Sequence, residues 1–139
     1  KIQGMAGLRV GYVVAQQETL DIIQKITRGG MGISLPSVYA AMASLEDIAF
    51  KDKSRKLNRE CREYVYENLD RLGFEYVPSS TSFIIFPIEM DGKSFLEKMT
   101  AKGVGVRAFE IYGKNWCRVS MGTMDEMKLF TAALEKVLV

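Results

Sequence analysis

Apolar residues along this chain fall into two kinds of pattern, one typical of helices and one typical of strands. Apolar residues three or four positions apart predict a series of helices. They lie over residues 18–28, after the cap residue Ser34, over residues 47–72, between Asp91 and Gly103, and from Thr123 to Val137. Short apolar runs bounded by turn-forming residues predict strands at Tyr12–Ala15, Phe83–Phe86, Val104–Arg107 and Trp116–Met121, with a short strand or turn at Glu75–Pro78.

The longest predicted helix has the clearest signal. Leu57, Cys61, Val65 and Leu69 recur at every fourth position and form one apolar stripe, while lysine, arginine and glutamate fill the other faces. Acidic residues are mixed among the basic ones, which favours a solvated face over a basic binding strip. Gly73 follows the stripe and predicts the end of the helix.

The strand pattern predicts a small sheet with one charged position inside it. Alternation in the last strand places Arg118 on the face opposite Cys117 and Val119. A charge in so apolar a strand is costly unless it is paired or faces a polar cleft. The run Phe83–Phe86 is apolar on both faces and predicts a buried central strand closed by Pro87. Together the patterns predict an α/β fold, in which helices pack against a small mixed sheet.

Composition narrows the class of protein. The 139 residues are 47% hydrophobic and 26% charged, with a formal net charge of +2, which is typical of a soluble globular domain. Acidic and basic residues are interleaved, so we do not expect a nucleic-acid partner. No apolar run reaches the length of a membrane span, so we expect no membrane insertion.

Histidine is absent from the chain, and cysteine occurs only twice. Without histidine, Ser-His and Cys-His nucleophile systems and most zinc sites are excluded, and we predict no metal site. Cys61 and Cys117 lie in separate predicted elements without CxxC spacing. Reduced core thiols in a cytoplasmic protein are therefore favoured over a redox pair.

The N-terminal loop carries the strongest chemical signal. Lys1, Gly4, Gly7 and Arg9 lie within one loop, ahead of an apolar run. Glycine permits positive φ and close approach of another segment or a ligand, and the planar fork of arginine suits a phosphate or carboxylate. An amine that can form an imine, close to an arginine that can hold a phosphate, is what pyridoxal phosphate chemistry requires. For the loop alone, a glycine-rich turn with a surface arginine is the alternative.

Two motifs resemble one known family. From Lys1 onward, the order K-x-x-G-M-x-G-x-R-V-G resembles the cofactor-lysine signature of the class I/II aminotransferases, which are fold-type I pyridoxal phosphate enzymes. Around Arg118, the order W-x-R-V-S-x-G-T resembles the family's small-domain strand, whose arginine grips the substrate α-carboxylate. The resemblance covers essentially the whole chain. It is nearest to the histidinol-phosphate aminotransferase branch.

The resemblance implies parts of two domains. Residues 1–46 would be the incomplete tail of the large cofactor-binding domain. Residues 47–139 would be the C-terminal small domain, beginning with a long linking helix. Because the chain starts at the signature lysine without an initiator methionine, we expect a fragment of a longer enzyme.

The resemblance also implies roles for individual residues. Lys1 would hold the cofactor and shuttle a proton, and Arg9 would bind the cofactor phosphate. Arg118 would hold the substrate α-carboxylate, with an arginine paired to a neighbouring acid as the alternative. Arg107 would contact a substrate phosphate or a second carboxylate, with a surface ion pair as the alternative. Ser82 stands where family members often carry asparagine, which is a departure from the family pattern.

The implied reaction is amino transfer between an amino acid, or a histidinol-phosphate-like amine, and a 2-oxo acid. The cofactor would be pyridoxal 5′-phosphate, and the parent enzyme would be a homodimer. The family's other cofactor ligands lie upstream of the lysine, so we expect this chain alone to be inactive.

Other functions remain open from the sequence. A related decarboxylase or C–S lyase of the same fold would share both motifs. From a different class, a non-enzymatic α/β module could bind a small anion or a protein partner through the glycine-arginine loop and the Arg118 face. The sequence does not identify the amino donor or acceptor.

Overall fold

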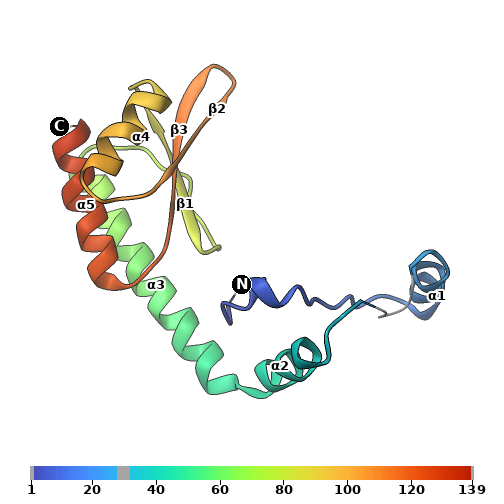
Figure 1. Cartoon of the computed structure of the whole chain (residues 1–139). Helices are drawn as coiled ribbons and strands as arrows, with labels where there is room; N and C mark the ends of the chain where they lie inside the picture. The colour runs from blue at the N-terminus through green and yellow to red at the C-terminus, as the bar shows by residue number, and fades with distance from the viewer. Residues whose placement is uncertain (1, 28–31, 139) are drawn as a thin grey trace. The chain divides into compact units, whose positions relative to one another are not determined.

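The computed structural model describes residues 2–27 and 32–138, whose helices and strands are drawn in Figure 1. In chain order they are η1 (Ala6–Leu8), α1 (Gln17–Ile26), α2 (Leu35–Glu46), α3 (Ile48–Arg71), β1 (Phe83–Ile88), α4 (Gly92–Ala101), β2 (Arg107–Ile111), β3 (Lys114–Ser120) and α5 (Met124–Leu138). The chain divides into two compact units, Lys1–Ser54 and Arg55–Val139. We call them the N-terminal unit and the C-terminal unit.

The helices of the N-terminal unit follow the predicted pattern. Helix α1 begins one residue before the predicted range of 18–28, and the glycine stop predicted after it lies outside the described residues. Helix α2 begins directly after Ser34, whose hydroxyl accepts a hydrogen bond from the Ser37 backbone N–H at 3.4 Å. Pro36 stands in the first turn, where its fixed φ suits the helix. The start of α2 is therefore the one that the sequence predicts.

The strand predicted at Tyr12–Ala15 is wrong, because no strand forms there. Tyr12, Val13 and Val14 are 77%, 58% and 85% exposed. A strand needs a hydrogen-bonded neighbour, and no other segment of the described residues pairs with this run. The side chains of this run are as apolar as those of a buried strand, but no sheet among the described residues includes them.

Helix α3 confirms the long helix predicted from the apolar stripe. Cys61, Val65 and Leu69 are fully buried, whereas Leu57 at the start of the stripe is 38% exposed. Gly73 follows the helix with a φ of +77°, in the left-handed region that favours glycine. The helix ends there as predicted.

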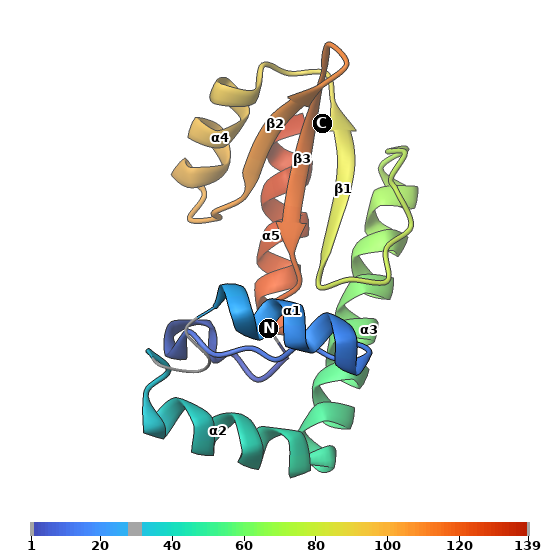
Figure 2. The ribbon, with the colours of Figure 1, turned by 90° about the vertical axis from the view of Figure 1, so that its right-hand side faces the viewer.

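The sheet of the C-terminal unit has the strand order β1-β3-β2, and both pairings are antiparallel. Figure 2 shows β3 between the other two strands. The predicted α/β fold class is confirmed, with an antiparallel sheet where the prediction had a mixed one. The alternation predicted for β3 is also confirmed. Cys117 and Val119 are buried, and Arg118 between them projects from the other face.

The prediction of a buried central strand at Phe83–Phe86 is wrong. β1 is an edge strand that continues through Pro87, and its side chains alternate between half-buried and buried. An edge strand leaves one row of backbone groups unpaired, so proline, which lacks an N–H, is tolerated within it. The predicted element at Glu75–Pro78 is reduced to an isolated bridge between Val77 and Ile85.

The strand predicted at Val104–Arg107 is displaced along the chain, because β2 begins at Arg107. The residues before it complete the end of α4 instead. The Val104 N–H donates to the Met99 carbonyl at 3.1 Å, and Gly103 has a φ of +78°. These bonds satisfy carbonyl groups at the end of α4, so Gly103 and Val104 do not join the sheet.

A two-residue turn joins β2 to β3. Ile111 pairs with Lys114, and Tyr112 and Gly113 between them have φ values of +51° and +73°. Positive φ at both central positions occurs in type I′ turns, whose twist matches that of paired strands. The turn length fixes the register of the whole hairpin.

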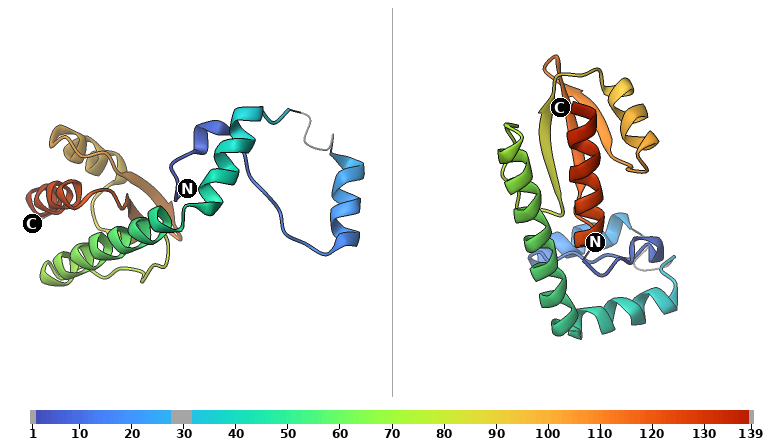
Figure 3. Two further views of the ribbon diagram at one scale, coloured as in Figure 1. Left: turned by 90° about the horizontal axis from the view of Figure 1, so that it is seen from below. Right: turned by 90° about the vertical axis from the view of Figure 1, so that its left-hand side faces the viewer.

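Helix α5 lies across one face of the sheet, with α3 and α4 on either side of it (Figure 3). The Phe86 ring of β1 lies 6.0 Å from the Phe74 ring and 6.4 Å from the Phe130 ring, measured between centroids. These rings are part of a continuous apolar core between the helices and the sheet. Cys61 and Cys117 are buried within this core and free, as predicted.

Both helix caps predicted in the C-terminal unit are confirmed. The Asp91 carboxylate accepts a hydrogen bond from the Ser94 N–H at 2.9 Å, and this bond lowers the pKa of the Asp91 carboxyl. The Glu126 carboxylate accepts from the Thr123 N–H at 2.7 Å, while the Thr123 hydroxyl accepts from the Glu126 N–H at 3.3 Å. This reciprocal pair is the capping box that opens α5.

Candidate functional site

The four predicted site residues fall in different parts of the molecule. Lys1 lies outside the described residues, so its role stays a prediction. Arg9 belongs to the N-terminal unit, and Arg107 and Arg118 belong to neighbouring strands of the C-terminal unit. The structure therefore brings two of these residues together on one sheet.

The loop around Arg9 has a left-handed residue at each end. Gly4 has a φ of +67°, and Arg9, which follows η1, has a φ of +50° and a ψ of +43°. The Arg9 backbone N–H and its Nη1 both donate to the Ala6 carbonyl, each at 3.3 Å. Gly7 lies in η1 without positive φ, so the positive φ that the sequence suggested for this glycine is not found. The exposed Arg9 side chain has further donors that an anion could accept.

Helix α2 holds this loop through two serines that the sequence analysis missed. Ser37, which is 2% exposed, donates from Oγ to the Leu8 carbonyl at 2.8 Å. The Ser44 Oγ lies 3.3 Å from the Met5 sulfur, and the Ser44 carbonyl accepts from Gln3 Nε2 at 3.2 Å. The two serines stand two helical turns apart in a largely apolar helix, which was the signal available in the sequence.

Arg107 and Arg118 form a cross-strand pair. They stand directly opposite each other in the register of β2 and β3, so they project from the same face of the sheet. This is the face turned away from the core, because Cys117 and Val119 point into the core from the other face. Arg118 is half-buried and Arg107 is exposed. The sequence identified both arginines but did not show that they are neighbours.

No carboxylate of the described residues pairs with either arginine of this pair. Like charges directly opposite each other destabilise a strand pair. The Arg118 Nε and the Trp116 Nε1, on the same face, are both buried and have no hydrogen-bond acceptor among the described residues. The guanidinium carbon of Arg118 lies 4.6 Å from the centre of the Phe83 ring. The ion pairs that would explain these arginines structurally are thus not found in the part of the chain that is described.

The segment that follows β3 is tied down from two sides. The Cys61 thiol donates to the Gly122 carbonyl at 3.4 Å, and burial of this thiol raises its pKa. The Glu126 carboxylate accepts from both the N–H and the hydroxyl of Thr123, and these bonds lower the pKa of the Glu126 carboxyl. A Cβ at Gly122 would collide with this carboxylate, so a larger residue there would displace the Glu126 side chain from Thr123. The end of the arginine-bearing strand is therefore held in one place.

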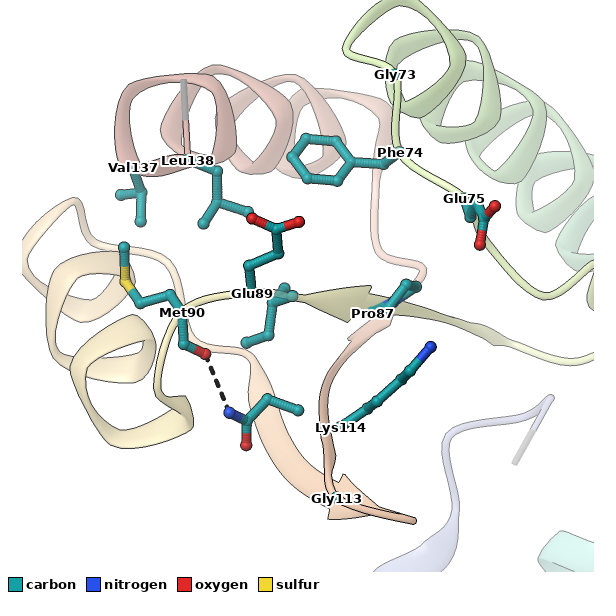
Figure 4. Close-up of a pocket in the computed structure, with 12 residues that line it drawn as sticks. Gly73, Phe74, Glu75, Pro87, Glu89, Met90, Gly113, Lys114, Val137 and Leu138 are labelled. Carbon is teal, nitrogen blue, oxygen red and sulfur yellow. Dashed lines mark hydrogen bonds between the residues drawn. The ribbon is translucent and has the colours of Figure 1, made fainter.

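A separate groove of about 1040 Å³ lies at the hairpin end of the sheet (Figure 4). Glu89 and Lys114 line it, together with apolar side chains such as Leu138. Within its lining, Asn115 Nδ2 donates to the Met90 carbonyl at 3.3 Å. Neither arginine of the cross-strand pair lines this groove, and neither does Arg9.

The described residues contain no group of three or more histidine, cysteine, aspartate or glutamate side chains that could hold a metal ion. Within the same residues, no helix is long and apolar enough to cross a membrane. The candidate site residues among them are instead positively charged: Arg9 lies on its loop, and Arg107 and Arg118 lie on the sheet.

Comparison with known families agrees with the motifs at both places. The family model described as aminotransferase class I and II matches residues 1–134. The chain belongs to this aminotransferase family. The family recognised from the motifs around Lys1 and Arg118 is therefore confirmed.

Several class I and II aminotransferases are similar over nearly the whole chain. Histidinol-phosphate aminotransferase from Moorella thermoacetica is 37% identical over 99% of this chain and 36% of its own length. Histidinol-phosphate aminotransferase 1 from Cupriavidus pinatubonensis is 39% identical over 99% of this chain and 38% of its own length. The chain spans less than two-fifths of the length of these relatives.

A solved aminotransferase shares the fold. The structure of histidinol-phosphate aminotransferase from Sinorhizobium meliloti in complex with pyridoxal-5′-phosphate has a TM-score of 0.86 and 26% sequence identity. The match covers 99% of this chain and 39% of that chain. The helices and the small sheet described above are therefore those of the aminotransferase fold.

Proposed function

We propose that this chain is part of a pyridoxal phosphate-dependent aminotransferase, which moves an amino group between an amino acid, or a histidinol-phosphate-like amine, and a 2-oxo acid. Residues 1–46 are assigned to the end of the large cofactor-binding domain, and residues 47–139 to the small domain. Family membership supports the reaction class, and the names of the relatives support the histidinol-phosphate branch. Because the chain spans so little of those relatives, it is proposed to be inactive alone.

The observation that carries the proposal is the arginine pair on the sheet. An acid bound between Arg107 and Arg118 would relieve their mutual repulsion and accept hydrogen bonds from donors that have no carboxylate partner. Arg118 stands on the central strand and is assigned to the substrate α-carboxylate, because two parallel hydrogen bonds fix the plane of an amino acid. Arg107, on an edge strand, is assigned to a substrate phosphate or a second carboxylate.

Arg9 fits the cofactor phosphate. Its exposed guanidinium lies beside a loop with left-handed residues at positions 4 and 9, and a Cβ at Gly7 would meet no atom within 4 Å. An anion can therefore approach the loop closely. When bound, pyridoxal 5′-phosphate supplies a ring that accepts electrons as the substrate Cα–H bond breaks. Lys1 is proposed to hold the cofactor through Nζ and to take the proton from the substrate Cα.

A homodimeric parent enzyme is part of the same proposal. Apolar side chains of α2, among them Leu35, Tyr39, Met42 and Leu45, are exposed on the N-terminal unit. Contiguous apolar surface of this kind usually marks an interface. Sedimentation of the longer protein that contains this sequence would give its oligomeric state.

The test of the proposed function compares that longer protein with the 139-residue chain. Each is incubated with pyridoxal 5′-phosphate and with 2-oxoglutarate as the amino acceptor. The amino donor is histidinol phosphate or one of a panel of L-amino acids. We expect the longer protein to form glutamate and an oxo product in equal amounts, and the short chain to do no more than the free cofactor. Carbon dioxide or sulfide released without amino transfer would instead indicate a decarboxylase or a lyase and refute the proposal.

Replacement of Arg118 tests its assigned role. Arg118→Lys keeps the charge but loses the fork, so kcat/KM for carboxylate-bearing substrates should fall about 10- to 100-fold, as expected for a lost charge-assisted hydrogen bond. Arg59→Lys, the same change at an exposed position of α3, is the matched control and should leave kcat/KM unchanged. An equal loss in both variants would contradict the assignment.

A further inference from the structure

Phe83, the first residue of β1, lies diagonally across the strand pair from Arg118. In the register, Phe83 stands opposite Ser120, and Arg118 stands opposite Ile85. Diagonal neighbours on one face of a sheet are within reach of aromatic and long side chains. The ring centre of Phe83 lies 4.6 Å from the guanidinium carbon of Arg118, within the range of an attractive cation–π contact.

Hydrogen bonds do not explain the orientation of the Arg118 side chain. Its Nε is buried without an acceptor among the described residues, and no carboxylate of those residues pairs with the guanidinium. On the other side, Arg107 stands directly opposite and repels it. Among the described residues, the Phe83 ring is therefore the group that makes an attractive contact with the Arg118 guanidinium.

Phe83 is also placed where packing alone does not require an aromatic residue. It is half-buried on the face of the sheet away from the helices, outside the set of buried residues that forms the core. Its neighbours along the strand, Ile84 and Phe86, are the residues that point into the core. A leucine or methionine at position 83 would cover similar apolar surface without the negative ring face that attracts a cation.

We propose that Phe83 is a positioning residue for Arg118. The ring holds the guanidinium against the sheet and offsets the repulsion from Arg107, so that the terminal nitrogens keep one orientation toward an incoming anion. A cation–π contact restricts the plane of an arginine fork without using its hydrogen-bond donors, which stay available to the ligand. The inference rests on the proposed function of Arg118 as an anion-binding fork. It adds to that function the residue that fixes the orientation of the fork.

The first test measures anion binding without catalysis. In the 139-residue chain, the NMR signal of the Arg118 Nε–H is followed during titration with inorganic phosphate. Phe83→Leu and Phe83→Met should each weaken phosphate binding about 3- to 10-fold, while Phe83→Tyr, which keeps a ring face, should bind like the unmodified chain. Phe109→Leu is the matched control, because Phe109 is half-buried on the same face but pairs with Trp116.

The outcomes separate positioning from packing. Equal weakening in Phe83→Leu and Phe109→Leu would overturn the inference, because it would show a general loss of packing. Unchanged binding in both Phe83→Leu and Phe83→Met would overturn it too. A lack of any phosphate-dependent change at Arg118 in the unmodified chain would have the same consequence.

The second test uses the longer holoenzyme. Phe83→Leu should raise KM for carboxylate-bearing substrates about 3- to 10-fold with a smaller change in kcat, and Phe83→Tyr should restore KM. A loss of kcat in Phe83→Leu at unchanged KM would overturn the inference. If the longer protein transfers no amino group while phosphate binding still depends on Phe83, the proposed function fails and the positioning role stands.

Discussion

The two units of the chain have similar kinds of side chain but bury them very differently. In the C-terminal unit, a continuous core includes fully buried Val65, Phe86 and Leu134. Among the described residues of the N-terminal unit, Ser37 is the sole buried residue, while apolar side chains such as Tyr12 are exposed. An apolar sequence therefore makes a core only where other elements are present to cover it.

This difference in burial predicts which unit contributes most of the stability of the chain. Full burial of a large apolar side chain contributes roughly 1.5–3 kcal/mol, whereas an exposed one contributes little. The free energy of unfolding should therefore come mainly from the C-terminal unit. The arginine pair lies on this stable unit, and the Arg9 loop lies on the other. The next three predictions test that contrast, from the largest expected effect to the smallest.

The core of the C-terminal unit should be the most sensitive to substitution. Phe86→Ala removes a fully buried ring that packs near Phe74 and Phe130, so it should lower the free energy of unfolding by about 3–5 kcal/mol. Tyr12→Ala in the N-terminal unit should change it by less than about 0.5 kcal/mol, because that side chain is 77% exposed. Urea unfolding followed by circular dichroism measures both values. Similar losses would show that the two units are equally packed.

Glycines should show the same contrast at a smaller scale. Gly73→Ala forces a side chain into a left-handed conformation at the end of α3, which should cost about 1–2 kcal/mol. Gly7→Ala is the matched change in the N-terminal unit. It meets no atom within 4 Å and needs no positive φ, so the free energy of unfolding should stay within about 0.5 kcal/mol. A cost at Gly7 as large as that at Gly73 would contradict the comparison.

Acid should weaken the C-terminal unit through its helix caps. The pKa of Glu126 is lowered in the folded state, because its carboxylate accepts hydrogen bonds from Thr123. Its stabilising effect is therefore present above the unfolded-state pKa and is lost as the pH falls through the folded-state pKa. We expect Glu126→Gln to have a lower Tm than the unmodified chain at pH 6, and the difference to narrow at pH 3.

The control for the acid experiment lies in the N-terminal unit. Glu18→Gln changes a carboxylate in the first turn of α1, a helix without buried residues. It should leave both the Tm and its fall with acid unchanged. Thermal melting at several pH values gives the Tm of the unmodified chain, Glu126→Gln and Glu18→Gln. A Tm difference between Glu126→Gln and the unmodified chain that stays constant with pH would count against a role for the capping carboxylate.

Local patterns predicted the helices well, because their determinants lie close together in the sequence. The stripe through Cys61, Val65 and Leu69 needs only the period of a helix, and the stop at Gly73 follows from one residue. The capping box at Thr123 is likewise complete within four positions. These elements depend little on what surrounds them.

Strands were predicted less well, because their place depends on partners far away in the sequence. The run at Tyr12–Ala15 has the composition of a buried strand but no partner among the described residues. The run at Phe83–Phe86 lies at an edge of the sheet, since β3 occupies the centre. The pairing of Arg107 with Arg118 and the contact of Phe83 with Arg118 follow from this register, so the sequence could name the arginines but not their arrangement.

The two-residue turn at Tyr112 and Gly113 has a consequence for how this site can be inherited. Because side chains alternate between the two faces of a strand, loss of a single codon between Arg107 and the turn would move Arg107 to the helix-covered face. The gene would still encode both arginines, but their side chains would no longer lie on the same face of the sheet. In related sequences that keep the arginine pair, the number of residues between the two arginines is therefore expected to stay even, as it is here, even where the residues themselves differ.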